Sequence, residues 1–374
     1  MEDISNRKLE HIEICLKDDV EMHTNTTGFE DVWFVHRCLP ELDIDEIKLE
    51  VELLGFKLKA PLMISAMTGG HPKTKQINEA LAEVVEEMGL AMAVGSQRAA
   101  LLDDSLVETF SVVRKKAPTA FIIANIGAAQ LSVGLSLSDL HKIVSMIDAD
   151  ALAVHLNPTH EFSQINGEPK FRGVLEAIRK AADAIDVPII VKETGCGIAR
   201  EDAIRLVNEG HVKAIDVAGA GGTSWCKVEA IRAKRWGDER KVKVVEPFME
   251  WGIPTAISII EVRSAVDVPV IASGGIRNGL DCAKAIAIGA DVTGIALPAL
   301  RAVSRGVNSL RMYLDIVIEQ LRGAMFLTGS RRINDLKKVE VVISGRVKSW
   351  LEARGLDVNT YLKRRRASWT SQPK

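Results

Sequence analysis

The sequence predicts an α/β fold, a single (β/α)₈ TIM barrel, on three observations. From about residue 59 onward, eight short apolar runs rich in Val, Ile and Ala alternate with amphipathic stretches of helical length, which is the pattern of repeated β/α units. The runs are apolar throughout, as expected for parallel strands that are buried on both faces. A doubly wound sheet would also alternate in this way, but polar or glycine-rich residues follow every run, which favours a closed barrel with its site at the strand ends.

The elements follow one another in a regular order. The expected strands are residues 62–66, 90–94, 120–125, 151–155, 188–192, 214–218, 269–273 and 291–296. Helix boundaries are also marked, since Thr74 opens the helix after the first strand and Gly89 closes it.

Three regions are expected along the chain. Residues 1–58 precede the first strand and should cap the barrel, residues 59–330 should form the barrel, and residues 331–374 should add a C-terminal helical extension and tail. A long insertion at about 221–252 separates the sixth strand from its helix. Connections of this length are usually functional, so we expect a lid.

The composition of the 374 residues is that of an ordinary globular protein. Hydrophobic residues make up 47% and the net charge is −2, so neither nucleic-acid nor membrane-surface binding is indicated. The apolar runs are far too short to span a bilayer and the first residues are polar, which favours a cytoplasmic location. The five cysteines form no CxxC pair, so we expect free thiols rather than a zinc cluster or disulfides.

The clearest chemical signal lies at the ends of the seventh and eighth strands. The run SGGIR at 273–277 offers glycine amides and the charge of Arg277, and ALP follows the eighth strand at 296–298. Together with Thr223 on the sixth loop, these residues predict a phosphate site near a helix N-terminus. A glycine pair alone would be a weak signal, because such pairs often serve only a tight turn.

Lys192 lies at the very end of the fifth apolar strand, where burying its charge requires an anionic partner. In flavin-binding barrels such a lysine can lie against the N1/O2 edge of the isoalloxazine and stabilise the anionic reduced ring. The alternative is a buried ion pair with Glu193 or another carboxylate.

Other polar residues suggest a site for an anionic substrate. Glu161 follows His155 by six residues, and one carboxylate with phosphate oxygens and water suits Mg²⁺, although a loop glutamate is usually a surface charge. His155 and Asn157 are two residues apart on an extended segment and could face one pocket. Near the N-terminus, the spacing of Arg7, Lys8 and His11 places them on one face of a helix. If that helix caps the mouth of the barrel, they would bind diphosphate together with Arg98. Otherwise they are a surface charge cluster.

These motifs together resemble the type 2 isopentenyl diphosphate isomerases. The resemblance covers nearly the whole chain and is carried by MTGG at 67–70, GSQR at 95–98, HLN at 155–157 followed by Glu161, KExGxG from Lys192, SGGIR, and the Arg-Lys pair near the start. It implies FMN contacts at Ala66, Met67, Thr68, Ser96, Asn125, Lys192, Thr223, Gly275, Ile276, Arg277, Ala296 and Leu297. It implies substrate contacts at Arg7, Lys8, Ser96, Gln97, Arg98, His155 and Asn157, with Glu161 on Mg²⁺. We expect His11, His160 and Trp225 to contact the substrate as well.

One position departs from the family pattern, which has Gln where this chain has His160, just before the metal glutamate. An imidazole can donate or accept a hydrogen bond, but it lacks the paired donor and acceptor of an amide and titrates near neutral pH. We therefore predict that His160, at a position that touches substrate in the family, impairs proton transfer.

The resemblance implies a reaction in which isopentenyl diphosphate becomes dimethylallyl diphosphate, with reduced FMN itself as acid and base and NADPH or NADH as reductant. It also implies a homo-oligomer, a tetramer or octamer. In the insertion, Trp225 could cover the pocket and Glu229 could join a proton relay, although both could equally be ordinary helix residues. The alternatives are an FMN-dependent 2-hydroxy-acid oxidase, which would need a base and arginines near the seventh strand where only Arg277 is visible, and a non-catalytic flavin-binding barrel.

Overall fold

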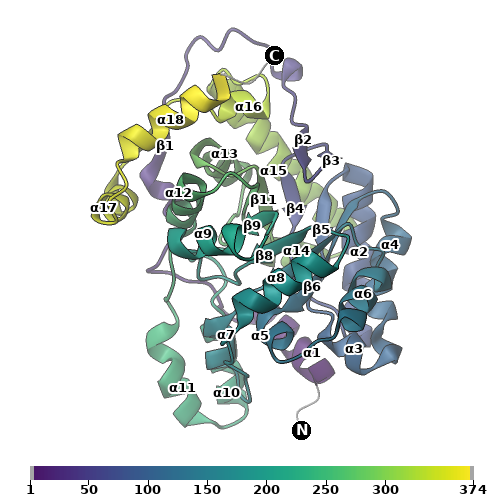
Figure 1. The fold of residues 1–374 in the computed structure, drawn as a ribbon. Coiled ribbons are helices and arrows are strands. Elements are labelled where there is room, and N and C mark those ends of the chain that lie inside the picture. The colour runs from purple at the N-terminus through teal and green to yellow at the C-terminus, as the bar shows by residue number, and fades with distance from the viewer. Residues whose placement is uncertain (1–3, 371–374) are drawn as a thin grey trace.

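A closed barrel of eight parallel strands forms the centre of the molecule (Figure 1). The computed structural model describes residues 4–370 of the chain, and the side chains of residues 5–367. The strands, in the order in which they close the ring, are β10 (Val270–Ala272), β11 (Val292–Ile295), β4 (Leu62–Ile64), β5 (Ala91–Ala93), β6 (Phe121–Gly127), β7 (Ala151–His155), β8 (Ile189–Lys192) and β9 (Ala214–Asp216). All eight predicted strands and the predicted fold class are therefore confirmed.

Helices surround the barrel, and most of them bury one apolar face against the strands. The longer ones are α2 (Pro72–Met88), α4 (Glu108–Lys116), α6 (Leu137–Met146), α8 (Val174–Ala184), α9 (Arg200–Asn208), α12 (Thr255–Ala265), α13 (Gly279–Ile288), α14 (Leu297–Val303) and α15 (Val307–Leu327). Helix α2 begins at Pro72, two residues earlier than predicted, because His71 caps it by accepting from the Lys73 amide. Its predicted end is confirmed, since Gly89 takes the left-handed conformation there.

A short hairpin lies at the amino ends of the strands. It consists of β2 (Val51–Leu53) and β3 (Phe56–Leu58), whose Leu53 and Leu58 pack with residues of the barrel interior. Phe56 also contacts the ring of Phe121 at the start of β6, with 4.6 Å between the centroids. Because this end is filled by apolar side chains, a ligand can enter only from the carboxyl ends.

Other segments lie over the carboxyl ends. They are α1 (Ile4–Lys17), the loop helices α3 (Arg98–Leu102), α5 (Ala128–Ser132) and α7 (Pro158–Ser163), and the insertion helices α10 (Trp225–Arg235) and α11 (Glu239–Val245) with the 3₁₀ turn η4 (Glu246–Phe248). Helix α1 contacts α10 and α14, and Arg235 pairs with Asp18 at 2.6 Å. Figure 1 shows α1, α7 and α10 at the opposite end of the barrel from β2 and β3. The insertion is thus ordered as helices, and its action as a lid stays a prediction.

The C-terminal segment packs against the barrel helices. It contains α16 (Ile333–Leu336), β12 (Val341–Ile343), α17 (Gly345–Ala353) and α18 (Val358–Thr370), and β12 pairs with β1 (Val32–Phe34). The remaining short elements are the 3₁₀ turns η1 (Phe29–Asp31), η2 (Ile44–Glu46) and η3 (Asp104–Leu106). In α18, Tyr361 and Arg365 donate hydrogen bonds to carbonyls of α13. The predicted three-region division stays a prediction, and residues 1–3 and 371–374 of it lie outside the described part.

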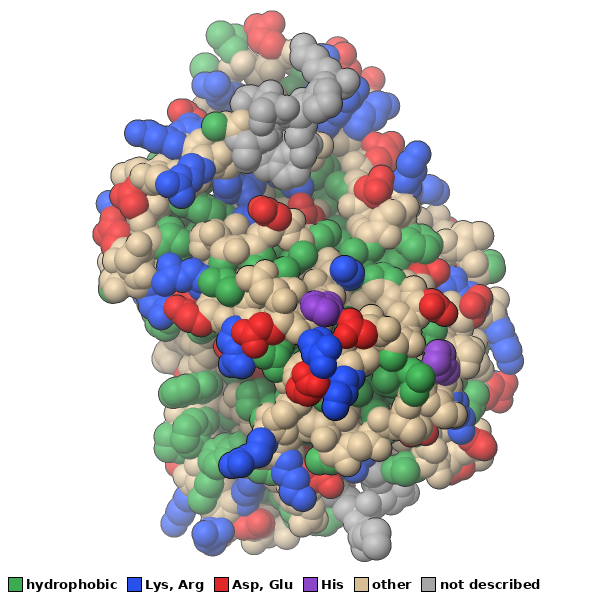
Figure 2. Space-filling view, viewed as in Figure 1, with side chains coloured by type: hydrophobic (Ala, Val, Ile, Leu, Met, Phe, Trp, Pro, Cys, Tyr) green, Lys and Arg blue, Asp and Glu red, His purple; other side chains and the backbone are tan. Residues whose placement is uncertain are grey.

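Surface and thiol chemistry agree with the composition. On the face shown in Figure 2, basic and acidic side chains are interspersed rather than segregated. All five cysteines are free. Among the described residues, every helix is too short or too polar to cross a bilayer.

Candidate active site

One cavity opens at the carboxyl ends of the strands and is lined by residues from all eight strand ends and from α1. Most of the predicted site residues border it: Arg7, Lys8, His11, Ala66, Met67, Thr68, Ser96, Arg98, Asn125, His155, Asn157, His160, Glu161, Lys192, Thr223, Trp225, Gly275, Ile276, Arg277, Ala296 and Leu297. The chain therefore brings together side chains that are up to 290 positions apart, as from Arg7 to Leu297.

Two predicted residues do not line the cavity. The side chain of Gln97 is fully buried beneath it, accepts from the Asn125 amide at 3.0 Å and donates to the Ile143 carbonyl at 2.8 Å. Since both ends of its amide are used in holding β6 to α6, the geometry does not support the predicted contact with substrate. Glu229 is also fully buried, behind His11 and His160.

The pairing of β7 with β8 places two cavity residues side by side. His155 and Lys192 are direct neighbours across these strands, and the Asn125 amide oxygen lies 2.7 Å from His155 Nδ1. Burial lowers the pKa of His155 well below its usual value, and the charges of Lys192 and Lys8 act in the same direction. His155 is therefore a neutral imidazole at neutral pH.

Lys192 is buried and does not pair with the carboxylate of Glu193. Its ammonium donates to the Glu193 main-chain carbonyl at 2.5 Å, while the Glu193 carboxylate accepts from the amides of its own turn, including Thr194 at 2.6 Å and Gly195 at 2.7 Å. Burial raises the pKa of Glu193 to about 7. The structure therefore shows no Lys192–Glu193 ion pair, whereas another carboxylate, that of the cross-strand neighbour Asp216, does interact electrostatically with Lys192. Lys192 also lies on the cavity wall, where its charge suits an anionic ligand.

The phosphate end is formed by the loops after β9 and β10. Gly274 and Gly275 both have positive φ values, 93° and 73°, and their backbone lies on the cavity wall beside Thr223. Sequence reasoning missed Glu21, whose carboxylate accepts from Arg277 Nε at 2.9 Å and from Arg301 Nη1 at 2.9 Å. Arg277 is therefore held in place by a residue 256 positions away, which no motif indicated.

Three buried oxygens of the cavity lack a hydrogen-bond partner within the described residues: Ser65 Oγ, Thr68 Oγ1 and Asn157 Oδ1. Buried polar atoms are normally satisfied, so these groups indicate a polar ligand. All three border the cavity; the resemblance implies an FMN contact at Thr68 and a substrate contact at Asn157. The residues present therefore fit a flavin nucleotide with a polar substrate beside it.

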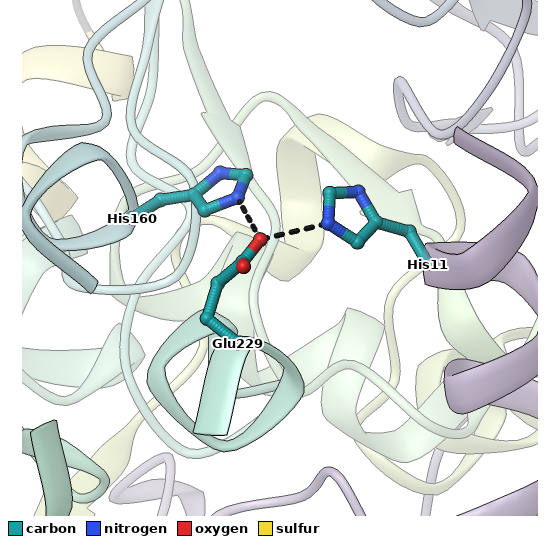
Figure 3. A group of neighbouring side chains, drawn as sticks. All are labelled: His11, His160 and Glu229. Atoms are coloured by element: carbon teal, nitrogen blue, oxygen red, sulfur yellow. Dashed lines mark hydrogen bonds and ion pairs between the residues drawn. The ribbon is translucent and has the colours of Figure 1, made fainter. Parts of the chain in front are cut away.

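Helices α1, α7 and α10 contribute a cluster of four side chains, three of which are drawn in Figure 3. Glu229 Oε1 lies 2.7 Å from His11 Nε2 and 3.0 Å from His160 Nε2. The ring of His160 stacks on Trp225, with centroids 4.4 Å apart and planes inclined by 18°. Burial disfavours ionisation of Glu229, but the hydrogen bonds from the two imidazoles outweigh it, and its pKa lies well below the usual value.

Glu161 lies next to this cluster in α7. Its Oε1 accepts from Asn157 Nδ2 at 3.1 Å and its Oε2 from the Glu168 amide at 2.8 Å. Glu168 in turn pairs with Arg98 at 3.0 Å. Each carboxylate oxygen of Glu161 keeps a free lone pair, so the chemistry of the group fits one hard cation shared with a phosphate.

Comparison with known proteins places this site in a family. A family model described as FMN-dependent dehydrogenase matches residues 1–133 and 130–342. The isopentenyl-diphosphate delta-isomerase of Methanothermobacter thermautotrophicus is 47% identical over 96% of this chain and 99% of its own length, and that of Sulfurisphaera tokodaii is 46% identical over 96% of both chains. The chain belongs to the isopentenyl-diphosphate delta-isomerase family. It is an FMN-dependent isomerase, as the resemblance implied.

The solved structures that resemble this isomerase share its fold at low identity. A lactate oxidase of Pediococcus acidilactici has a TM-score of 0.63 at 18% identity and covers 92% of this chain, with 91% of its own length matched. A mandelate oxidase variant with an FMN adduct has a TM-score of 0.59 at 18% identity over 86% of this chain and 90% of its own. At this identity the similarity shows the barrel architecture alone.

We expect Gly275→Ala to weaken FMN binding. A methyl group at this position would lie 2.2 Å from Thr27 Cγ2 and 2.7 Å from the Gly221 carbonyl oxygen, and the φ of 73° is unfavourable for alanine. Strain of about 1–3 kcal/mol would displace the loop, and FMN affinity should fall at least about tenfold. Flavin fluorescence titration measures this. Gly323→Ala is the matched control, because nothing lies within 4 Å of a methyl group there, and equal affinities in the two variants would contradict the prediction.

Proposed function

We propose that this isomerase converts isopentenyl diphosphate to dimethylallyl diphosphate in the cavity at the carboxyl ends of the strands, as part of isoprenoid biosynthesis. The observation that carries the proposal is the convergence of Lys192, the glycine loop at 274–275 and the unsatisfied Thr68 and Asn157 on one cavity of a chain 47% identical to a named isomerase. The reaction adds a proton to the terminal methylene carbon and removes one from C2, so no electrons are lost overall.

The flavin and the side chains would divide this work between them. When bound, reduced FMN would supply an acid and base group and an anionic ring that opposes developing positive charge. Lys192 would stabilise that ring, and the side chains at the phosphate end would hold the cofactor. Trp225 and α10 would exclude water from the cavity. This matters because an isolated alkene is a weaker base than water and would lose the proton to it.

The diphosphate would be bound by a second set of cationic residues. Arg7, Lys8 and Arg98 all border the cavity and can make charge-assisted hydrogen bonds to phosphate oxygens. Burial, reinforced by Arg7, lowers the pKa of Lys8 to about 8, so Lys8 remains mostly charged at neutral pH. Binding energy from this remote group would hold the hydrocarbon in place for protonation.

Glu161 would bind Mg²⁺ together with the diphosphate. We expect Glu161→Gln to raise the Mg²⁺ concentration needed for half-maximal activity by about 10–100-fold, because a neutral amide binds a hard dication much less tightly than a carboxylate. Steady-state rates at varied Mg²⁺ measure this shift. Glu176→Gln, on an exposed face of α8, is the control, and an unchanged Mg²⁺ requirement in Glu161→Gln would remove Glu161 as the ligand.

The activity itself is tested by an anaerobic assay of the FMN-loaded chain with NADPH or NADH, Mg²⁺ and isopentenyl diphosphate, following dimethylallyl diphosphate. Product formation that requires reduced flavin is expected. Oxygen consumption with lactate or glycolate would instead indicate a 2-hydroxy-acid oxidase, and tight FMN binding without either reaction would indicate a non-catalytic barrel. A cytoplasmic location and assembly as a homo-oligomer, a tetramer or octamer, belong to the same proposal, and light scattering measures the second.

A further inference from the structure

The cluster of His11, His160 and Glu229 has the composition and spacing of a metal-binding site. Among the described side chains, these three are the one group of three or more His, Cys, Asp and Glu residues whose ligand atoms all lie within 4.8 Å of one another. Both imidazoles present Nε2 to the same carboxylate oxygen, as Figure 3 shows. The residues come from α1, α7 and α10, so the set exists only in the folded chain.

Neighbouring side chains hold the three groups in this orientation. Trp225 stacks on His160 and meets the edge of His11, with ring centroids 5.2 Å apart. Arg232 Nη1 lies 3.3 Å from Glu229 Oε2, which leaves Oε1 to face the two imidazoles. Packing and hydrogen bonds of this kind orient the ligands in protein metal sites.

We infer that His11, His160 and Glu229 bind a first-row transition-metal dication such as Zn²⁺. Two imidazole nitrogens and one carboxylate oxygen are a ligand set used for Zn²⁺ and for non-haem Fe²⁺, with the remaining positions open to water or substrate. Zn²⁺ binds nitrogen and oxygen at about 2.0–2.2 Å, so an ion at the centre of the cluster requires only a small outward shift of the two rings. Mg²⁺ prefers oxygen ligands and should compete poorly at this cluster.

An ion can reach the cluster, and the local charge permits it. His11 and His160 line the cavity, whereas Glu229 lies behind them and is fully buried. Three carboxylates face two guanidinium groups there: Arg232 pairs with Glu10 at 2.6 Å and with Glu229 at 3.3 Å, and Arg7 interacts electrostatically with both Glu229 and Glu161. Because the two imidazoles line the cavity, the open coordination positions of an ion would face it.

The resemblance implies Gln at position 160 in the family pattern, so the metal site depends on the histidine that this chain has there. With glutamine there, one imidazole and one carboxylate would remain, which is too few ligands for a tight site. As a consequence that rests on the proposed function, Zn²⁺ should inhibit isomerisation, because the ion would occupy the wall beside Glu161 where the substrate lies.

Metal binding is tested by titrating the FMN-loaded full-length protein with Zn²⁺ in a large excess of Mg²⁺, using calorimetry. One tight equivalent per chain is expected. His160→Gln and His11→Gln should each weaken Zn²⁺ binding at least about tenfold. Removing a residue that merely orients a metal ligand already weakens binding by about that much, and removing the ligand itself should cost at least as much. His211→Gln is the matched control, because His211 Nδ1 also lies 2.7 Å from a carboxylate, that of Asp183, but on the exposed surface.

Equal Zn²⁺ affinity in His160→Gln and in the unchanged protein would overturn the inference, as would loss of the tight equivalent in His211→Gln. FMN content and circular dichroism check that each variant is folded, and either of the two site variants suffices for the comparison. Because the measurement records binding alone, it gives an answer even in a protein that fails to isomerise isopentenyl diphosphate.

Discussion

Replacing Lys192 with methionine is expected to lower the kcat of isomerisation by about 100- to 1,000-fold, the effect of removing one preorganised electrostatic group from an active site. The methionine side chain has a similar length and fills the same buried space, so the change removes the charge while keeping the packing. That charge lies at the end of β8 beside His155, donates to a main-chain carbonyl and interacts electrostatically with the buried carboxylate of Asp216. It also borders the cavity, where it would stabilise an anionic flavin ring. The reduction potential of bound FMN should fall together with kcat.

The control for this variant is Lys284→Met. Lys284 is also a partly buried lysine that donates to a main-chain carbonyl, that of Phe29 at 2.8 Å, but it lies on α13 away from the cavity. We expect its kcat and flavin potential to match those of the unchanged protein. If Lys192→Met retained FMN and kept kcat within about twofold, the role of Lys192 beside the flavin would be discarded, because an electrostatic contribution of that size is negligible.

Replacing His160 with glutamine, the residue that the resemblance implies at this position, is expected to raise kcat about tenfold, part of the 10²–10⁴-fold that general acid and base catalysis supplies. Nε2 of His160 is hydrogen-bonded to Glu229, and the ring stacks on Trp225. The second ring nitrogen, Nδ1, points in a different direction from Nε2. A glutamine amide has its donor and its acceptor at the same end. It could donate to Glu229 and still present its oxygen to the cavity, which would complete a path for protons.

This measurement should include a chelator that is selective for zinc over magnesium, so that relief of metal inhibition is separated from a gain in proton transfer. His141→Gln, on the exposed face of α6, is the control and should leave kcat unchanged. A kcat for His160→Gln that is no higher than that of the unchanged protein would show that the imidazole does not impair the reaction. The metal-binding inference would be unaffected by that result, because it depends on Zn²⁺ affinity.

The strands and the glycine loop were predictable because the signals are local. An apolar run such as β7 must be buried on both faces wherever it occurs, and its observed bounds, Ala151–His155, equal the predicted ones. Likewise, residues that directly follow a barrel strand must lie at its carboxyl end, which is why Thr68, Asn125, Lys192 and Gly275 could all be assigned to one cavity. The motifs also carried the family resemblance, since they cover nearly the whole chain.

The orientation of single side chains was less predictable. Gln97 belongs to a motif and follows a strand end, yet its amide turns inward because the Asn125 amide and the Ile143 carbonyl need partners. A motif gives the position of a residue along the strand end, but the hydrogen-bonding needs of neighbouring elements decide which way its side chain points.

The sequence by itself determined the closed barrel, the end at which its site lies and the residues that follow each strand, because burial and strand direction depend on neighbours in the chain. Only the tertiary structure decided which distant groups meet: Glu21 with Arg277, and His11 and His160 with Glu229. The histidines meet Glu229 because α1 and α7 both pack against α10. The residues in these pairs are 69 to 256 positions apart in the chain, and no local sequence pattern indicates that they will meet.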